Sequence, residues 1–153
     1  MTANLGSISS GTMRTEDLIP AFAAELDWCT SGGRADRTTE ESKLLADADG
    51  VEDYDSENAS EILSELFDAL NEHAPAYAYF GAHEGDGADY GFWIHSDVFE
   101  SHGCFDGLRV SDTSEVPADY VGEVLHVNDH GNATLYVKDK AESDELREIW
   151  AVV

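Results

Sequence analysis

The helix that decides the fold is encoded by residues 56–75, which read SENASEILSELFDALNEHAP. Its large apolar residues recur at intervals of one, three and four, and at 100° per residue they fall within an arc of roughly 140°. These residues are Ile62, Leu63, Leu66, Phe67 and Leu70. Pro75 ends the helical pattern. The sequence therefore predicts a helix that starts at about Ser56 and buries one side against a core.

Acidic residues occupy the opposite side of this helix. They are spaced by four, four, three and four residues, which places them within an arc of roughly 80°. This row, called the ladder below, consists of Glu57, Glu61, Glu65, Asp68 and Glu72. Like charges four residues apart cost a helix about 0.2–0.5 kcal/mol per pair, and the row contains no lysine. Because solubility is normally achieved with mixed signs, the ladder indicates a functional surface.

The sequence before this helix is acidic as well. Residues 36–72 contain 13 acidic side chains against only Arg37 and Lys43. Five of them form what we call the acidic segment, namely Asp47, Asp49, Glu52, Asp53 and Asp55. In the whole chain, 33 Asp and Glu against 8 Lys and Arg give a net charge of −25 on 153 residues. Such a surface repels nucleic acid and anionic membranes, and it attracts proteins whose own working surface is basic.

Two further helices are predicted upstream. After Thr15, a residue type that caps helices, apolar side chains repeat every four positions. Thr38 and Glu41 have the spacing of a capping box, which opens a shorter helix that ends near 49–50. Residues 1–12 show no periodicity, so we expect them to form a loose tail.

After Pro75 the sequence changes to β-branched and aromatic residues interrupted by Gly and Asp, which is typical of strands. The predicted strands are 76–80, 90–94, 108–110, 121–127, 133–137 and 147–153, with a helical turn at 97–101. A turn sequence at 128–131 predicts an antiparallel hairpin over 121–137. Helices followed by an antiparallel meander indicate an α+β fold, with N-terminal helices packed on a C-terminal sheet. We find no linker, so a single domain over 13–153 is expected.

The composition disfavours several classes of protein. A hydrophobic content of 42% is enough to build a core, and two cysteines are too few for a disulfide scaffold. The N-terminus has no apolar signal region, and no run approaches eighteen apolar residues, so we expect a cytoplasmic protein of the host cell without a membrane span. Basic residues are scattered and are not interleaved with aromatics, which disfavours direct binding of nucleic acid.

The glycine-rich loop 81–91 collects one histidine and three carboxylates. It lacks the EF-hand pattern, because Ala82 would open the calcium loop and Trp93 would close it. A different oxygen site for a hard cation stays open beside the simpler interpretation of a hairpin connection. Three residues are the candidates for a metal-dependent hydrolase, a third functional class: His83, Asp86 and Asp89.

The remaining soft metal ligands do not form a recognisable motif. They are His95, His102, Cys104, His126 and His130. His126 and His130 are four residues apart, but they lie on a predicted strand and its turn, so they do not share a helix face. No GxSxG elbow is present, and Cys29 beside Trp28 is typical of a buried small hydrophobe. We therefore predict no enzyme activity, no cofactor and no metal.

Two segments resemble those of small acidic proteins of unassigned function from phages and other mobile elements. They are 80–93, FGAHEGDGADYGFW, and 120–136, YVGEVLHVNDHGNATLY. The resemblance covers about the C-terminal two thirds of the chain and brings no functional residues with it. The resemblance implies a mobile element as the setting of this protein. Such elements often encode acidic inhibitors of host restriction or CRISPR enzymes.

The leading hypothesis is a non-enzymatic inhibitor that imitates nucleic acid. A nucleic acid strand presents a regular line of single negative charges, and a protein that binds phosphates cannot easily distinguish it from a line of carboxylates. The ladder and the acidic segment would then bind the cationic surface of a host restriction or CRISPR protein. The alternative is a binding or structural module adapted to high salt without mimicry, which the presence of only three lysines also fits. Neither reading determines the oligomeric state.

Overall fold

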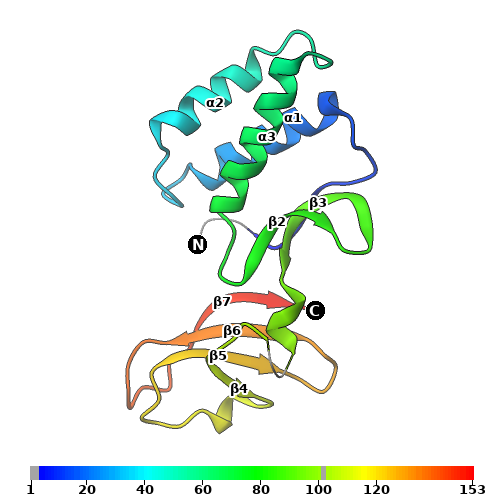
Figure 1. Cartoon of the computed structure of the whole chain (residues 1–153). Helices are drawn as coiled ribbons and strands as arrows, with labels where there is room; N and C mark the ends of the chain where they lie inside the picture. The colour runs from blue at the N-terminus through cyan, green and yellow to red at the C-terminus, as the bar shows by residue number, and fades with distance from the viewer. Residues whose placement is uncertain (1–3, 101–102) are drawn as a thin grey trace. The chain divides into compact units, whose positions relative to one another are not determined.

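A computed structural model describes residues 4–100 and 103–153 of the chain (Figure 1). It confirms the predicted α+β class, because three N-terminal helices are followed by antiparallel and mixed sheets. The chain divides into two compact units, an N-terminal unit up to His95 and a C-terminal unit from Ser96. This differs from the single domain expected over 13–153. The composition shift at Pro75 lies inside the first unit, and the division comes after the second strand that follows it.

The N-terminal unit contains the helices α1 (Thr15–Cys29), α2 (Thr39–Asp49) and α3 (Glu57–Glu72). The predicted capping box at the start of α2 is confirmed. The backbone N–H of Glu41 donates to Thr38 Oγ1 over 3.1 Å, and the backbone N–H of Thr38 donates to Glu41 Oε1 over 2.9 Å. These two bonds satisfy donors that would otherwise be left unpaired at a helix N-terminus.

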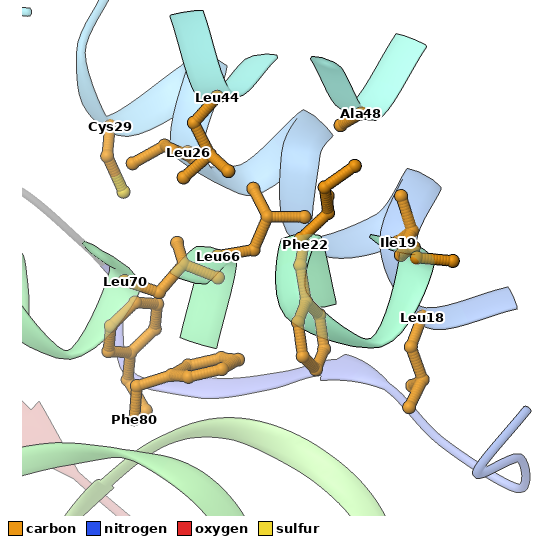
Figure 2. Close-up of a cluster of buried hydrophobic side chains, with 13 residues drawn as sticks. Leu18, Ile19, Phe22, Leu26, Cys29, Leu44, Ala48, Leu66, Leu70 and Phe80 are labelled. Carbon is orange, nitrogen blue, oxygen red and sulfur yellow. The ribbon is translucent and has the colours of Figure 1, made fainter. Parts of the chain in front are cut away.

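The core of this unit lies between α1, α2, α3 and two strands (Figure 2). Ile62, Leu66 and Leu70 from the predicted apolar stripe are buried, and Leu63 and Phe67 pack partly buried at its margin. Each fully buried side chain of this size contributes about 1.5–3 kcal/mol to folding. The stripe therefore fixes which side of α3 faces the core and, with it, which side faces solvent.

Three strands, β1 (Gly6–Ser9), β2 (Ala78–His83) and β3 (Asp86–Ile94), form an antiparallel sheet in the order β1-β3-β2. The prediction of a loose tail over 1–12 is wrong for β1. The segment has no periodicity of its own, because it is only half buried and its order comes from pairing with β3, more than 80 residues away. Its backbone lies so close to Gly91 that a Cβ atom there would be 2.1 Å from the carbonyl oxygen of Gly6.

The C-terminal unit contains β4 (Leu108–Val110), β5 (Gly122–Val127), β6 (Ala133–Lys138) and β7 (Arg147–Val152), in the sheet order β4-β5-β6-β7. The predicted hairpin of β5 and β6 is confirmed. Two departures appear. The strand β4 pairs parallel with β5, so the sheet is mixed and not a pure meander, and the strands predicted as one sheet belong to two.

Two short 3₁₀ helices complete the C-terminal unit, η1 (Ser96–Phe99) and η2 (Thr113–Glu115). The helical turn predicted at 97–101 corresponds to η1, although position 101 lies outside the described residues. The connection that contains η2 leads the chain from β4 to β5, which lets these two neighbours run parallel. It also supplies residues to a pocket of the C-terminal unit.

Candidate functional site: an acidic face on α2 and α3

All five ladder residues are exposed on α3, as the sequence predicted, and the opposite side of the helix is buried. The helix begins at a defined point, because Ser56 Oγ accepts the backbone N–H of Ala59 over 3.1 Å. A helix of this length with one buried side holds the Cβ atoms of its exposed residues in a fixed row. The ladder from Glu57 to Glu72 therefore extends about 22 Å at 1.5 Å per residue.

The acidic segment is also exposed throughout, and it belongs to the end of α2 and the turn that leads into α3. One of its members has a structural role that the sequence analysis missed. Asp53 Oδ1 accepts the backbone N–H of Asp55 over 3.0 Å, and the Asp53 carbonyl accepts Ser56 Oγ over 2.6 Å. This is an Asx-type turn, which uses the carboxylate to shape the entry to α3. The Asp53 carboxylate therefore already accepts one hydrogen bond before any partner binds.

Lys43 on α2 interacts with one residue of the acidic segment and with one residue of the ladder. The sequence analysis did not predict this, because the two sets are separate along the chain. Its Nζ atom lies 2.7 Å from Asp47 Oδ2, one helical turn away. Hydrogen bonding and charge from Asp47, and then the charge of Glu65, raise the pKa of Lys43 above its ordinary value. Asp47 of the acidic segment and Glu65 of the ladder therefore lie on the same side of the unit. The lysine also partly neutralises the charge of this acidic face.

A largely buried pair of side chains connects α2 to the residue that follows α3. Glu41 Oε2 lies 2.5 Å from His73 Nε2, and the two side chains are only 12% and 13% exposed. Burial alone would raise the pKa of Glu41, but hydrogen bonds with His73 and Thr38 lower it below its ordinary value. The sequence analysis missed this pair, since its members are 32 residues apart and only Glu41 has a local signal, the capping box.

The charge of the chain is not confined to this face. Residues 1–95 hold 20 of the 33 acidic side chains and four of the eight basic ones, while residues 96–153 hold 13 and four. Each unit thus carries roughly one net negative charge per six residues, enough for a negative potential over both. What distinguishes α2 and α3 is the regular, nearly uninterrupted row and not a higher overall charge.

The candidate cation loop is a hairpin whose polar groups are engaged locally. His83 Nδ1 accepts the backbone N–H of Gly85, and Asp86 Oδ1 accepts that of Ala88, each over 3.0 Å. Asp89 accepts the hydroxyl of Ser7 on β1. Within residues 4–100 and 103–153, no group of three or more His, Cys, Asp or Glu side chains is placed to hold a metal ion. The structure therefore does not gather His83, Asp86 and Asp89 into a metal site.

Among the described residues, the other soft ligands do not gather into a group that could hold a metal ion. His95 stacks at 5.0 Å on the ring of Tyr79, His126 Nε2 lies 3.0 Å from the carbonyl oxygen of Ser111, and His130 is exposed in the turn after β5. His102 lies outside the described residues, and Cys104 is exposed. Packing, hydrogen bonding and turn geometry account for the positions of His95, His126 and His130.

Cys29 is fully buried at the end of α1, as the sequence predicted. Burial, and then the neighbouring Glu25, raise the pKa of its thiol to about 12. Because the thiolate is the reactive species, this cysteine is a poor nucleophile at neutral pH. Burial likewise raises the pKa of Glu25.

Comparisons with known proteins add no relative. No protein-family model matches the chain, and searches of curated proteins and of solved structures found no match either. The resemblance to proteins of mobile elements therefore stays a prediction. Among the described parts of the chain, none of the helices combines the length and apolar character needed to cross a bilayer.

Proposed function

We propose that the acidic face of α2 and α3 imitates the phosphates of a nucleic acid and binds the cationic surface of a host defence protein, as an inhibitor of the anti-restriction or anti-CRISPR type. The observation that carries the proposal is the row of five exposed carboxylates on a helix whose other side is buried. Because the helix backbone is already ordered, docking of the row has to fix only the rotamers of its exposed side chains. The inhibitor needs no enzyme activity or cofactor, and it excludes nucleic acid by competition.

The spacing of the ladder indicates how much of the face the partner must contact. Its five charges over about 22 Å give one charge per roughly 5.6 Å, whereas one DNA strand carries one per 3.4 Å along the helix axis. The ladder alone is thus less densely charged than the strand it would replace. The acidic segment supplies five further exposed carboxylates, so the mimic requires both sets.

The test is capture of partners from a host lysate at low salt, with mass-spectrometric identification. Basic nucleic-acid-binding proteins should bind, and added salt or a duplex oligonucleotide should release them, because both compete for the same cations. The variant that tests the face reverses three exposed ladder charges: Glu61→Lys, Glu65→Lys and Asp68→Lys. It should fold and lose the captured proteins.

A matched control reverses three exposed charges in the C-terminal unit, which changes the net charge equally. Its substitutions are Asp106→Lys, Asp119→Lys and Asp129→Lys. The control should keep the captured proteins if the row matters, and lose them if only net charge matters. Equal capture by the ladder variant and the wild type would show that α3 is not the mimic.

The even charge of the two units favours a second candidate, a binding or structural module adapted to high salt. Both units show the same excess of carboxylates, and the whole chain has only three lysines. A protein of this kind loses stability at low salt through its own repulsion and gains it toward molar potassium chloride. Melting temperature measured against potassium chloride separates the two, because a mimic from an ordinary cytoplasm should be folded in dilute buffer.

A further inference from the structure

The C-terminal unit contains a pocket of about 300 Å³, formed by the connection that includes η2, the end of β6 and the loop after it. Its charged lining residues are Lys138 and Asp144. Three hydroxyls, from Thr113, Ser114 and Ser143, line it as well. The volume is at the lower end of the range for small-molecule sites.

Lys138 is the most unusual of these residues because it is only 2% exposed. Its Nζ atom donates to the carbonyl oxygens of Pro117 over 3.0 Å and Ala118 over 2.7 Å. An ammonium group has three protons to donate, and among the described residues no acceptor takes the third and no carboxylate pairs with the charge. A buried ammonium that faces only carbonyl dipoles is costly unless something completes it.

The other polar groups of the pocket differ in how far they are engaged by hydrogen bonds. Asp144 is exposed, and no ion pair to it is found in the described part of the chain. The Thr113 hydroxyl makes no side-chain hydrogen bond within residues 4–100 and 103–153, whereas the Ser114 side chain hydrogen-bonds with the carboxylate of Asp112. Ser143 Oγ accepts the backbone N–H of Glu145 over 3.2 Å, which leaves its own proton free to donate.

We propose that this pocket binds a free α-amino acid or a closely related small zwitterion. The ligand carboxylate would complete the ammonium of Lys138, and the ligand ammonium would pair with Asp144. The apolar lining residues Val116 and Leu146 would contact its side chain. With a net charge of −25, the protein repels a ligand that is anionic overall, such as phosphate, but not a neutral zwitterion.

A purely structural role for Lys138 explains less of the site. The carbonyl oxygen of Ala118 also accepts the backbone N–H of Glu142 over 2.7 Å, so the lysine helps to join the connection before β5 to the loop after β6. That role uses two ammonium protons. It does not account for Asp144 or for the hydroxyls of Thr113 and Ser143, which line the same pocket.

The experiment is a titration of the ¹⁵N-labelled full chain, followed by amide spectra, with the twenty protein amino acids at about 2 mM each, near the weak limit of specific binding. Saturable shifts should appear at positions 113–114 and 143–144. The best single amino acid is then compared with its analogues that lack either the ammonium or the carboxylate, and each analogue should bind at least tenfold more weakly. No saturable shift at these positions overturns the proposal, and so does tighter binding of inorganic phosphate.

Variants test each half of the site. Lys138→Met keeps an unbranched side chain and removes the charge, so the folded variant should lose binding at least tenfold. Should that variant not fold, Asp144→Asn decides, because Asp144 is exposed. It should reduce affinity for the amino acid to that of the analogue without the ammonium, while Asp106→Asn outside the pocket leaves it unchanged. Wild-type affinity in Asp144→Asn overturns the zwitterion assignment.

Discussion

His73 Nε2 lies 2.5 Å from Glu41 Oε2, and this contact connects the C-cap residue of α3 to the first turn of α2. The same carboxylate accepts the backbone N–H of Thr38 in the capping box. One side chain thus stabilises the start of a helix and its attachment to a neighbouring helix. The acidic face depends on both, because Asp47 and Glu65 lie on these two helices.

The first prediction concerns Glu41→Gln. The pKa of Glu41 is lowered in the folded protein from its ordinary value of 4.5, so its contribution to stability is present above that pH and is lost as the pH falls through the lower folded value. At pH 7 the variant should be less stable by about 1–3 kcal/mol, the range for a partly buried charged hydrogen bond.

Urea unfolding of both proteins at pH 7 and at pH 3.5 measures this difference. The difference in free energy of unfolding between wild type and variant should be smaller at the lower pH. The other carboxylates are the same in both proteins, so their contributions to this difference cancel. Glu40→Gln, an exposed neighbour in the same helical turn, is the control and should show little change. A gap that does not depend on pH would contradict the assigned role of Glu41.

The second prediction concerns Gly91→Ala. A Cβ atom at this position would lie 2.1 Å from the carbonyl oxygen of Gly6, so β1 must move away from β3. We expect a loss of about 1–3 kcal/mol, as for other forced displacements in a packed region, and faster amide hydrogen exchange in β1. Gly87→Ala is the matched control, because no atom lies within 4 Å of its Cβ position. Equal exchange in the two variants would show that β1 does not depend on this close approach.

The third prediction concerns the energetic cost of the ladder. Replacing Glu61 by Gln and Asp68 by Asn interrupts every neighbouring pair of like charges in the row. At about 0.2–0.5 kcal/mol per pair, the double variant should gain about 1–2 kcal/mol at low ionic strength. The gain should fade in molar salt, which screens exposed charges. Thermal or urea unfolding at the two salt concentrations measures this gain in stability. An unchanged stability at low salt would mean that repulsion within the ladder does not destabilise the helix.

The fourth prediction concerns Lys43→Gln. This variant removes the cation that lies beside Asp47 and contributes to the same field as Glu65. A basic partner captured by the acidic face should then elute at higher salt than it does from the wild type, because one repulsive charge is gone. Lys140→Gln, an exposed lysine in the C-terminal unit, changes the net charge equally and should leave the elution unchanged. Identical elution of both variants would place the partner elsewhere.

The sequence predicted those parts of the molecule whose signals are local. The apolar stripe that includes Leu66 recurs every three or four residues, and the capping box joins Thr38 to a residue three positions later. Both patterns follow from helical geometry. Exposure of the ladder follows from the same geometry, because the side opposite a buried stripe faces solvent.

What the sequence did not predict depends on distant partners. The strand β1 is ordered by β3, Lys43 acts on Glu65 from another helix, and Lys138 is buried by carbonyl groups about twenty residues earlier. A Gly-Ser-Ile-Ser stretch or a single lysine gives no periodic signal for such contacts. The parallel pairing of β4 has the same origin, since it depends on the path of the connection through η2.

The two cysteines have such different environments that one of them can be labelled selectively in the natural chain. Cys104 is open to solvent, whereas Cys29 is sealed in the first unit with a thiol that stays protonated. A maleimide dye should attach to Cys104 alone under native conditions. The rate of the slower modification of Cys29 would then measure how often the N-terminal unit opens, without any engineered residue.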